Sequence, residues 1–178
     1  MKLPRRLPWL LAISLLVIAA DRVTKVWVTE HIAFGGVIPV IDHVLRITHW
    51  TNDGAAFSLF ADTASPQVVR WVLTCFASIA AMVVLAVMIR IGSRFTPTTI
   101  ALALILAGAL GNMYDRVRYG EVTDFIEVHI FSYHWPDFNV ADSSIVSGAC
   151  LLLLDSLRAS KHEEQAAANA ETPEISAD

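Results

Sequence analysis

The sequence predicts an α-helical integral membrane protein with four transmembrane helices. Of its 178 residues, 55% are hydrophobic and 17% are charged, whereas a soluble domain of this size carries about 25% charged residues. The charges are also segregated, which leaves two windows without any, Trp71–Ile89 and Phe95–Tyr114, of 19 and 20 residues. A helix of about 20 apolar residues crosses roughly 30 Å of hydrocarbon, so each window predicts one span.

Four spans are expected, at residues 7–28, 68–89, 95–114 and 141–157. The first and fourth are weaker, because their charge-free runs end at Asp21 and Asp155. A cleavable signal peptide is the alternative for the first, since basic residues precede an apolar run that ends at Ala20. The small-residue cleavage pattern fails, however, because Ile18 stands where a small residue is required. We therefore expect the first segment to be retained as a helix.

Basic residues beside the spans predict that both termini are cytoplasmic. Seven of them lie on the side of the termini: Lys2, Arg5, Arg6, Arg90, Arg94, Arg158 and Lys161. The opposite side holds six, all in or beside polar motifs: Arg22, Lys25, Arg46, Arg70, Arg116 and Arg118. This topology gathers the polar residues at the outer ends of the spans on the non-cytoplasmic face, and it predicts one polar site there.

The loops on that face differ in composition. Residues 31–67 contain β-branched runs bounded by glycine-rich turns, which predict a small sheet resting on the membrane. Residues 117–140 are rich in aromatic side chains, which suits the membrane interface. We expect residues 1–160 to form a single membrane-embedded domain. Residues 161–178, rich in Ala, Glu and Ser, are expected to be a disordered cytoplasmic tail.

Asp124 and Asp142 are the candidates for catalysis. Each lies where the second outer loop meets the membrane, and acids in or beside a membrane indicate function. Two carboxyl groups held close together cannot both ionise, so one stays protonated while the other serves as a base. The pair therefore predicts the chemistry of an aspartic protease.

Other polar residues admit a structural and a functional interpretation. Gly108, Asn112 and Arg116 share one face of the third span; the glycine suits close helix packing, whereas the two polar residues either support the loop or contact a substrate. Asp21 and Lys25 are spaced as an ion pair at a helix end, and Asn52 and Gly54 belong to a turn.

No metal, cofactor or nucleic acid is expected. His129 and His134 are spaced i, i+5, which fits no pair of ligands on one helix, and no cysteine accompanies them. Both cysteines fall in apolar segments, and no basic stripe indicates nucleic-acid binding. We also expect the protein to be a monomer.

Five motifs occur in order along the chain: A-D-R-V-T-K at 20–25, T-N-D-G-A-A-F-S at 51–58, A-G-A-L-G-N-M-Y-D-R at 107–116, G-E-V-T-D-F-I at 120–126 and F-N-V-A-D-S at 138–143. Together they closely resemble the bacterial lipoprotein signal peptidases, also called signal peptidase II. The resemblance covers roughly residues 7–158.

The resemblance implies an aspartic endopeptidase with a small periplasmic β-cradle and an amphipathic helix over the site. Such enzymes act in the bacterial inner membrane, where they remove signal peptides from diacylglyceryl-modified prolipoproteins by cutting on the N-terminal side of the lipidated cysteine. It implies that Asp124 and Asp142 are catalytic. The supporting residues that it implies are Asp21, Lys25, Asn52, Gly54, Gly108, Asn112, Arg116, Asn139 and Ala141.

Three other functions stay open from the residues. A Ser/Lys dyad would use Lys25 with Ser58 or Ser143. A proton- or ion-coupled transporter would need polar residues at the membrane midplane, where the second and third spans offer mainly Thr74 and Ser78 and no acid. A structural subunit would use the acids only to bind a partner.

Overall fold

The computed structural model describes residues 3–54 and 65–171. Within these residues, four helices are long and apolar enough to cross a membrane, as expected. The elements in chain order are α1 (Leu7–His31), β1 (Val37–Ile41), β2 (Leu45–Asn52), α2 (Pro66–Ile91), α3 (Pro97–Arg118), β3 (Val122–Ile130), β4 (Tyr133–Phe138) and α4 (Val140–Glu171).

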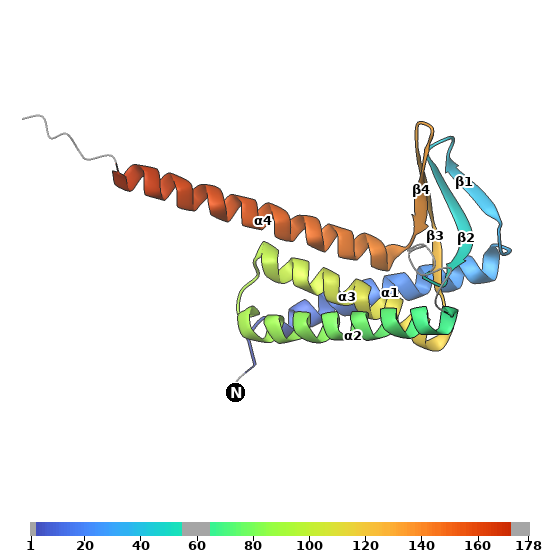
Figure 1. The fold of residues 1–178 in the computed structure, drawn as a ribbon, viewed down its shortest axis with the longest axis horizontal. Helices are drawn as coiled ribbons and strands as arrows, with labels where there is room; N and C mark the ends of the chain where they lie inside the picture. Colours follow the sequence, from blue (N-terminus) through green and yellow to red (C-terminus); the bar gives the residue numbers. More distant parts are fainter. Residues whose placement is uncertain (1–2, 55–64, 172–178) are drawn as a thin grey trace, which may run out of the picture.

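Helices α1, α2 and α3 run side by side, and the sheet stands at one end of this bundle (Figure 1). α1 begins and α4 ends on the side remote from the sheet. α3 is the central helix, because 56% of its apolar window is buried, against 17 to 22% for the other three. Leu10, Met88 and Leu106 belong to the core cluster where α1, α2 and α3 meet.

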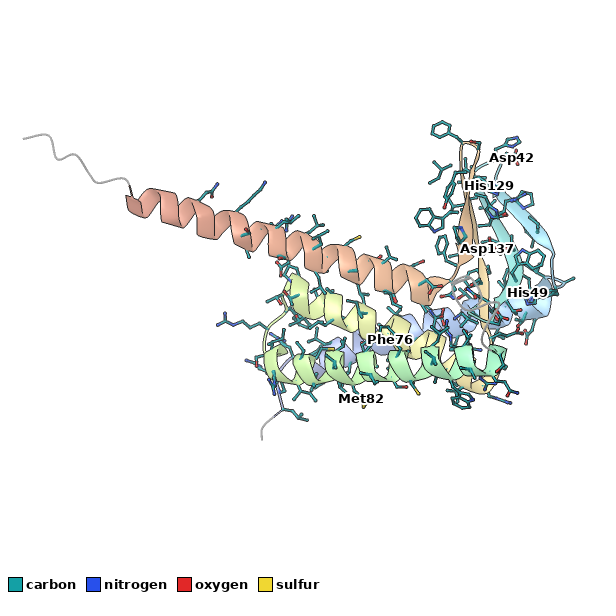
Figure 2. The ribbon with its side chains drawn as sticks, viewed as in Figure 1. Asp42, His49, Phe76, Met82, His129 and Asp137 are labelled. Carbon is teal, nitrogen blue, oxygen red and sulfur yellow. The ribbon has the colours of Figure 1, made fainter. Side chains whose placement is uncertain are left out.

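The outer surface of the helices is apolar. On α2, Phe76 is 71% exposed and Met82 is 62% exposed, and both are labelled in Figure 2. Large side chains exposed in this way suit a hydrocarbon solvent, which removes the driving force to bury them. The chain is a multi-pass membrane protein.

α2 and α3 are joined at the end of the bundle remote from the sheet. α2 ends at Ile91, and the backbone N–H of Gly92 still donates to Met88. α3 begins after Thr96, whose hydroxyl accepts from the Thr99 backbone N–H while the Thr99 hydroxyl accepts from the Thr96 N–H. This capping box satisfies two donors at the helix start and fixes where the third span begins.

The sheet draws on both outer loops, in the antiparallel order β1-β2-β3-β4. β1 and β2 confirm the sheet expected in the first loop. β3 and β4 come from residues 117–140, which we had assigned only to the interface. The hairpin was not predicted, because the aromatic side chains of residues 117–140 were explained by the membrane interface alone. The turn of this hairpin places Phe131 at a positive φ of 56°. Phe125 of β3 packs against Val28 of α1 and against Ile32, the residue that follows α1, and this contact attaches the sheet to the bundle.

The expectation of a disordered tail from residue 161 is wrong for residues 161–171. α4 continues as a helix to Glu171, beyond the bundle (Figure 1). This stretch is rich in Ala and Glu, which are strong helix formers, so the helix that begins in the membrane continues through it. Residues 172–178 lie outside the described part of the chain. So do residues 55–64, which include Ser58 and half of the T-N-D-G-A-A-F-S motif.

Candidate active site

Asp124 and Asp142 come from different elements that meet where the sheet joins the helices. Asp124 is on β3 and pairs with Trp50 of β2 across the sheet. Its side chain is buried, with 4% of the residue exposed. Asp142 is in the first turn of α4 and is half-buried. The short connection from β4 to α4 brings the second acid back toward the first.

Asn139 joins the two acids. It stands just before α4, and its backbone N–H donates to Asp142 Oδ2 at 3.2 Å while its side-chain oxygen accepts from the Asp142 backbone N–H at 3.0 Å. This reciprocal arrangement is a capping box, which fixes the start of a helix and the rotamer of the acid in its first turn. The amide nitrogen of Asn139 also donates to Asp124 Oδ1 at 2.7 Å.

Two further asparagines donate hydrogen bonds to the two carboxylate oxygens of the pair that Asn139 does not contact. Asn52 of β2 donates through Nδ2 to Asp124 Oδ2 at 3.2 Å. Asn112 of α3 donates through Nδ2 to Asp142 Oδ1 at 2.7 Å. Each of the four carboxylate oxygens therefore accepts one hydrogen bond. The donors of these four hydrogen bonds are all neutral amide groups, and they give the carboxyl pair a fixed geometry.

Burial, together with the nearby charge of Asp142, raises the pKa of Asp124 to about 7. Hydrogen bonds from Asn52 and Asn139 and the charge of Lys25 oppose this shift. Because the ordinary value is 3.8, the pair can hold a proton near neutral pH. Two carboxyl groups that share one proton are equipped to supply an acid and a base together.

An ion cluster lies behind the pair. Lys25 is buried, and its Nζ is 2.9 Å from Asp21 Oδ2 and 2.7 Å from Asp115 Oδ2. Arg22 also pairs with Asp115. Lys25 further donates to Asn112 Oδ1 at 3.3 Å, which turns the amide nitrogen of Asn112 toward Asp142. The cluster thus fixes the direction in which Asn112 presents its donor.

The remaining predicted residues act through backbone and packing. The Gly54 N–H donates to Asn52 Oδ1 at 2.8 Å, which orients that amide. The Ala141 N–H donates to Asp21 Oδ1 at 3.0 Å. A Cβ placed on Gly108 would lie 2.2 Å from the Ala141 carbonyl oxygen, so α3 and α4 can approach this closely only with glycine there.

Arg116 of α3 brings a positive charge near the pair. Its Nη1 donates to the Asn112 carbonyl at 3.4 Å, and its charge interacts with Asp142 and Asp124. Its Nε is buried and finds no hydrogen-bond partner among the described residues. A donor left in this state next to two carboxyl groups can hydrogen-bond a bound peptide.

The structure brings the sequence-predicted site residues into one network at the sheet end of the helices. Sequence reasoning missed the roles of Arg22 and Asp115. Asp115 pairs with Arg22 and Lys25 of α1. The signal was available, because a charged residue inside a span requires a partner and Arg22 stands one residue from Asp21.

The Ser/Lys alternative finds little support in this geometry. Lys25 Nζ is surrounded by Asp21, Asp115 and Asn112, and Ser143 donates instead to the Asn139 carbonyl at 2.8 Å. A base for a serine must contact its hydroxyl. Ser58 lies outside the described residues.

Fold and site together define a multi-pass membrane protein with a buried acid pair where its sheet meets its helices. The sequence profile of the family described as "Signal peptidase (SPase) II" matches residues 13–158. The chain belongs to the signal peptidase II family, which is a family of peptidases. Membership gives no support to the transporter alternative.

Known relatives agree with this assignment. The lipoprotein signal peptidase of Paraburkholderia phytofirmans is 44% identical over 151 residues, which are 85% of this chain and 85% of that protein. The lipoprotein signal peptidase of Pseudomonas putida is 42% identical over 160 residues, 89% of this chain and 92% of that protein. A solved structure described as a bacterial membrane enzyme is 31% identical, with a TM-score of 0.78, over 91% of this chain and 95% of that one.

Proposed function

We propose that this protein is an aspartic endopeptidase that removes signal peptides from diacylglyceryl-modified prolipoproteins. It cuts on the N-terminal side of the lipidated cysteine, with Asp124 and Asp142 as its catalytic residues. Family membership and the names of its relatives support the substrate class. The observation that carries the mechanism is the bridge that Asn139 makes between the two acids.

Asp124 holds the shared proton at rest, and Asp142 is the base. The raised pKa of Asp124 supports this division. Asp142 takes a proton from a water molecule that attacks the scissile carbonyl, and Asp124 donates a hydrogen bond to the carbonyl oxygen. The proton gained by the pair then goes to the leaving amine, so no covalent enzyme intermediate forms.

The supporting residues hold this machinery or the substrate. Asn52, Asn112 and Asn139 hold the carboxyl groups, and Arg116 binds the substrate backbone beside them. The apolar outer faces of the helices receive the signal helix and the diacylglyceryl chains.

Basic residues beside the spans support cytoplasmic termini and a site at the periplasmic leaflet of the inner membrane. The protein acts as a monomer and needs no cofactor.

The test is cleavage of a diacylglyceryl-modified prolipoprotein by purified protein in liposomes, followed on a gel. Asp124→Asn and Asp142→Asn should each lower turnover by roughly 100- to 10,000-fold, because this is the usual contribution of one group to general acid–base catalysis. Asp42→Asn is the matched control, since Asp42 is exposed in the β1–β2 turn.

Folded amounts are matched by gel filtration, and unlipidated substrate is run in parallel. Full turnover in either site variant would overturn the aspartic mechanism. Equal cleavage of lipidated and unlipidated substrate would overturn the substrate class and leave the mechanism standing.

A further inference from the structure

Three ligand-forming side chains gather on the outer half of the β3–β4 hairpin, outside the acid pair. They are Glu127, His129 and His134, and one ligand atom from each lies within 4.8 Å of the others. His129 and His134 are direct cross-strand partners. Glu127 lies two residues before His129 on β3, so both side chains point to the same face. The i, i+5 spacing of His129 and His134 fits no pair of ligands on one helix, and the structure explains it as the spacing of two cross-strand partners in a hairpin.

The donor atoms already converge. Glu127 Oε1 is 3.1 Å from His129 Nε2 and 2.8 Å from His134 Nε2. The imidazole rings stack, with centroids 4.9 Å apart and an interplanar angle of 12°. In a tetrahedral zinc site with bonds of about 2.1 Å, neighbouring ligand atoms lie roughly 3.4 Å apart. Small side-chain movements would therefore open the cluster to a metal ion.

Asp137 of β4 offers a fourth ligand. Its Oδ1 is 3.4 Å from His134 Nε2, and its Oδ2 accepts from the Thr48 hydroxyl at 2.8 Å. A hydrogen bond of this kind orients a ligating carboxylate. His129 and Asp137 are both labelled on the sheet, away from the bundle, in Figure 2.

We propose that Glu127, His129, His134 and Asp137 form a zinc-binding site that joins β3 to β4. Two imidazoles with two carboxylates suit Zn²⁺ and its neighbours in the first transition row, whereas Ca²⁺ and Mg²⁺ prefer oxygen ligands alone. The site is structural, because it lies on the strand that carries Asp124 and on the strand that leads into Asn139.

Arg46 competes with the metal. Its Nε is 2.5 Å from Glu127 Oε2, and its Nη2 is 2.6 Å from Glu127 Oε1 and 2.7 Å from His129 Nε2. The guanidinium stands in for the positive charge that Zn²⁺ would bring. Its side chain is 36% exposed, so it can withdraw from Oε1 toward solvent and keep Oε2. Removing it should therefore strengthen metal binding.

The test is zinc titration of full-length, tag-free protein in detergent after treatment with a chelator, by calorimetry. Wild type should bind one Zn²⁺ per chain, and Co²⁺ should give the absorption bands of a tetrahedral site. His129→Gln and His134→Gln should each weaken binding by more than the roughly 10- to 100-fold lost with an outer-shell partner. Arg46→Gln should tighten it, and Mg²⁺ should not bind.

His31→Gln is the matched control, because His31 is an exposed histidine at the end of α1. Melting curves without metal check that each variant is folded, and Zn²⁺ should raise the melting temperature of wild type, of the control and of Arg46→Gln more than that of either histidine variant. The absence of zinc binding by wild type would overturn the proposal, and so would equal binding by wild type and by both histidine variants.

Discussion

Asn139 has no exposed surface and contacts both candidate catalytic acids. Its backbone N–H serves Asp142 and its side-chain amide serves Asp124. Because one residue spans the two carboxyl groups, the separation of the acids follows from the start of α4 and not from a flexible loop. A geometry fixed in this way is what acid–base catalysis requires.

The protonation of Asp124 predicts how activity depends on pH. In the proposed mechanism, cleavage needs one proton on the pair, and Asp124 loses its proton as the pH rises through its pKa of about 7. We therefore expect kcat/KM to fall above about pH 7. The hydrogen bond from Asn52 favours the ionised form and lowers the pKa of Asp124. In Asn52→Ala, the alkaline limb of the profile, where kcat/KM falls, should therefore move to higher pH.

The measurement is a profile of kcat/KM against pH with the lipidated substrate in liposomes. Thr51→Ala is the control, because Thr51 neighbours Asn52 on β2 and makes no hydrogen bond to the pair in the described structure. A limb that stays in place in Asn52→Ala, or that moves to lower pH, would contradict the assignment of the proton to Asp124.

α3 and α4 pack through glycines at two levels. A Cβ on Gly108 would lie 2.2 Å from the Ala141 carbonyl oxygen, and one on Gly148 would lie 2.7 Å from the Ala101 carbonyl oxygen. Small residues let helix backbones approach closely in a membrane, where packing takes the place of the hydrophobic effect. The contact between Gly108 and Ala141 sets the position of Asp142, because Ala141 directly precedes Asp142.

Gly108→Ala should therefore weaken both the fold and the activity. The added methyl group meets backbone and must push α4 away, which costs about 1–3 kcal/mol of stability and displaces Asp142. Gly111→Ala is a graded comparison, since its Cβ would lie 3.0 Å from Asp21 Oδ2 and 3.2 Å from Ala141 Cβ. Melting temperature in detergent and turnover should both fall more for Gly108→Ala. A smaller effect at Gly108 would contradict this packing.

The elements show where sequence reasoning succeeds and where it stops. Hydropathy predicts all four spans, because the composition of a segment decides whether it enters a bilayer. Strand pairing is not local, so the partnership of Trp50 with Asp124 follows from no window of sequence. For the same reason, the sequence did not predict that His129 lies beside His134, since the two residues are partners only through the pairing of β3 with β4. Motif resemblance implied the site residues, but their hydrogen bonds needed the structure.

At the scale of the whole molecule, buried charges tie three helices together at one end. Lys25 of α1 pairs with Asp115 of α3 and with Asp21, and Asp21 accepts from the Ala141 N–H at the start of α4. Lys25 and both acids are 0 to 1% exposed. The stability of each buried charge depends on its partners, because no water is present to solvate a charge whose partner has been removed.

Lys25→Met should lower stability by about 3–5 kcal/mol, the usual loss when one partner of a buried pair is removed. Adding Asp21→Asn to Lys25→Met should recover part of this loss, because it removes a charge left without its partner. The readout is the melting temperature in detergent. Lys161→Met, an exposed lysine on α4, is the control, and equal melting temperatures for the two single variants would contradict the role of the cluster.

The sheet has a consequence for biosynthesis. β2 precedes the second and third spans along the chain, and β3 follows them. A nascent chain that has inserted only its first two helices therefore holds Asn52 without Asp124, and it holds neither Asn139 nor Asp142 until the rest has been translated. The order of synthesis therefore sets when the site can form: the pair of Asp124 and Asp142 is complete only once the start of the last helix has been made, and under the proposed function a copy that ends before that point should not cleave substrate.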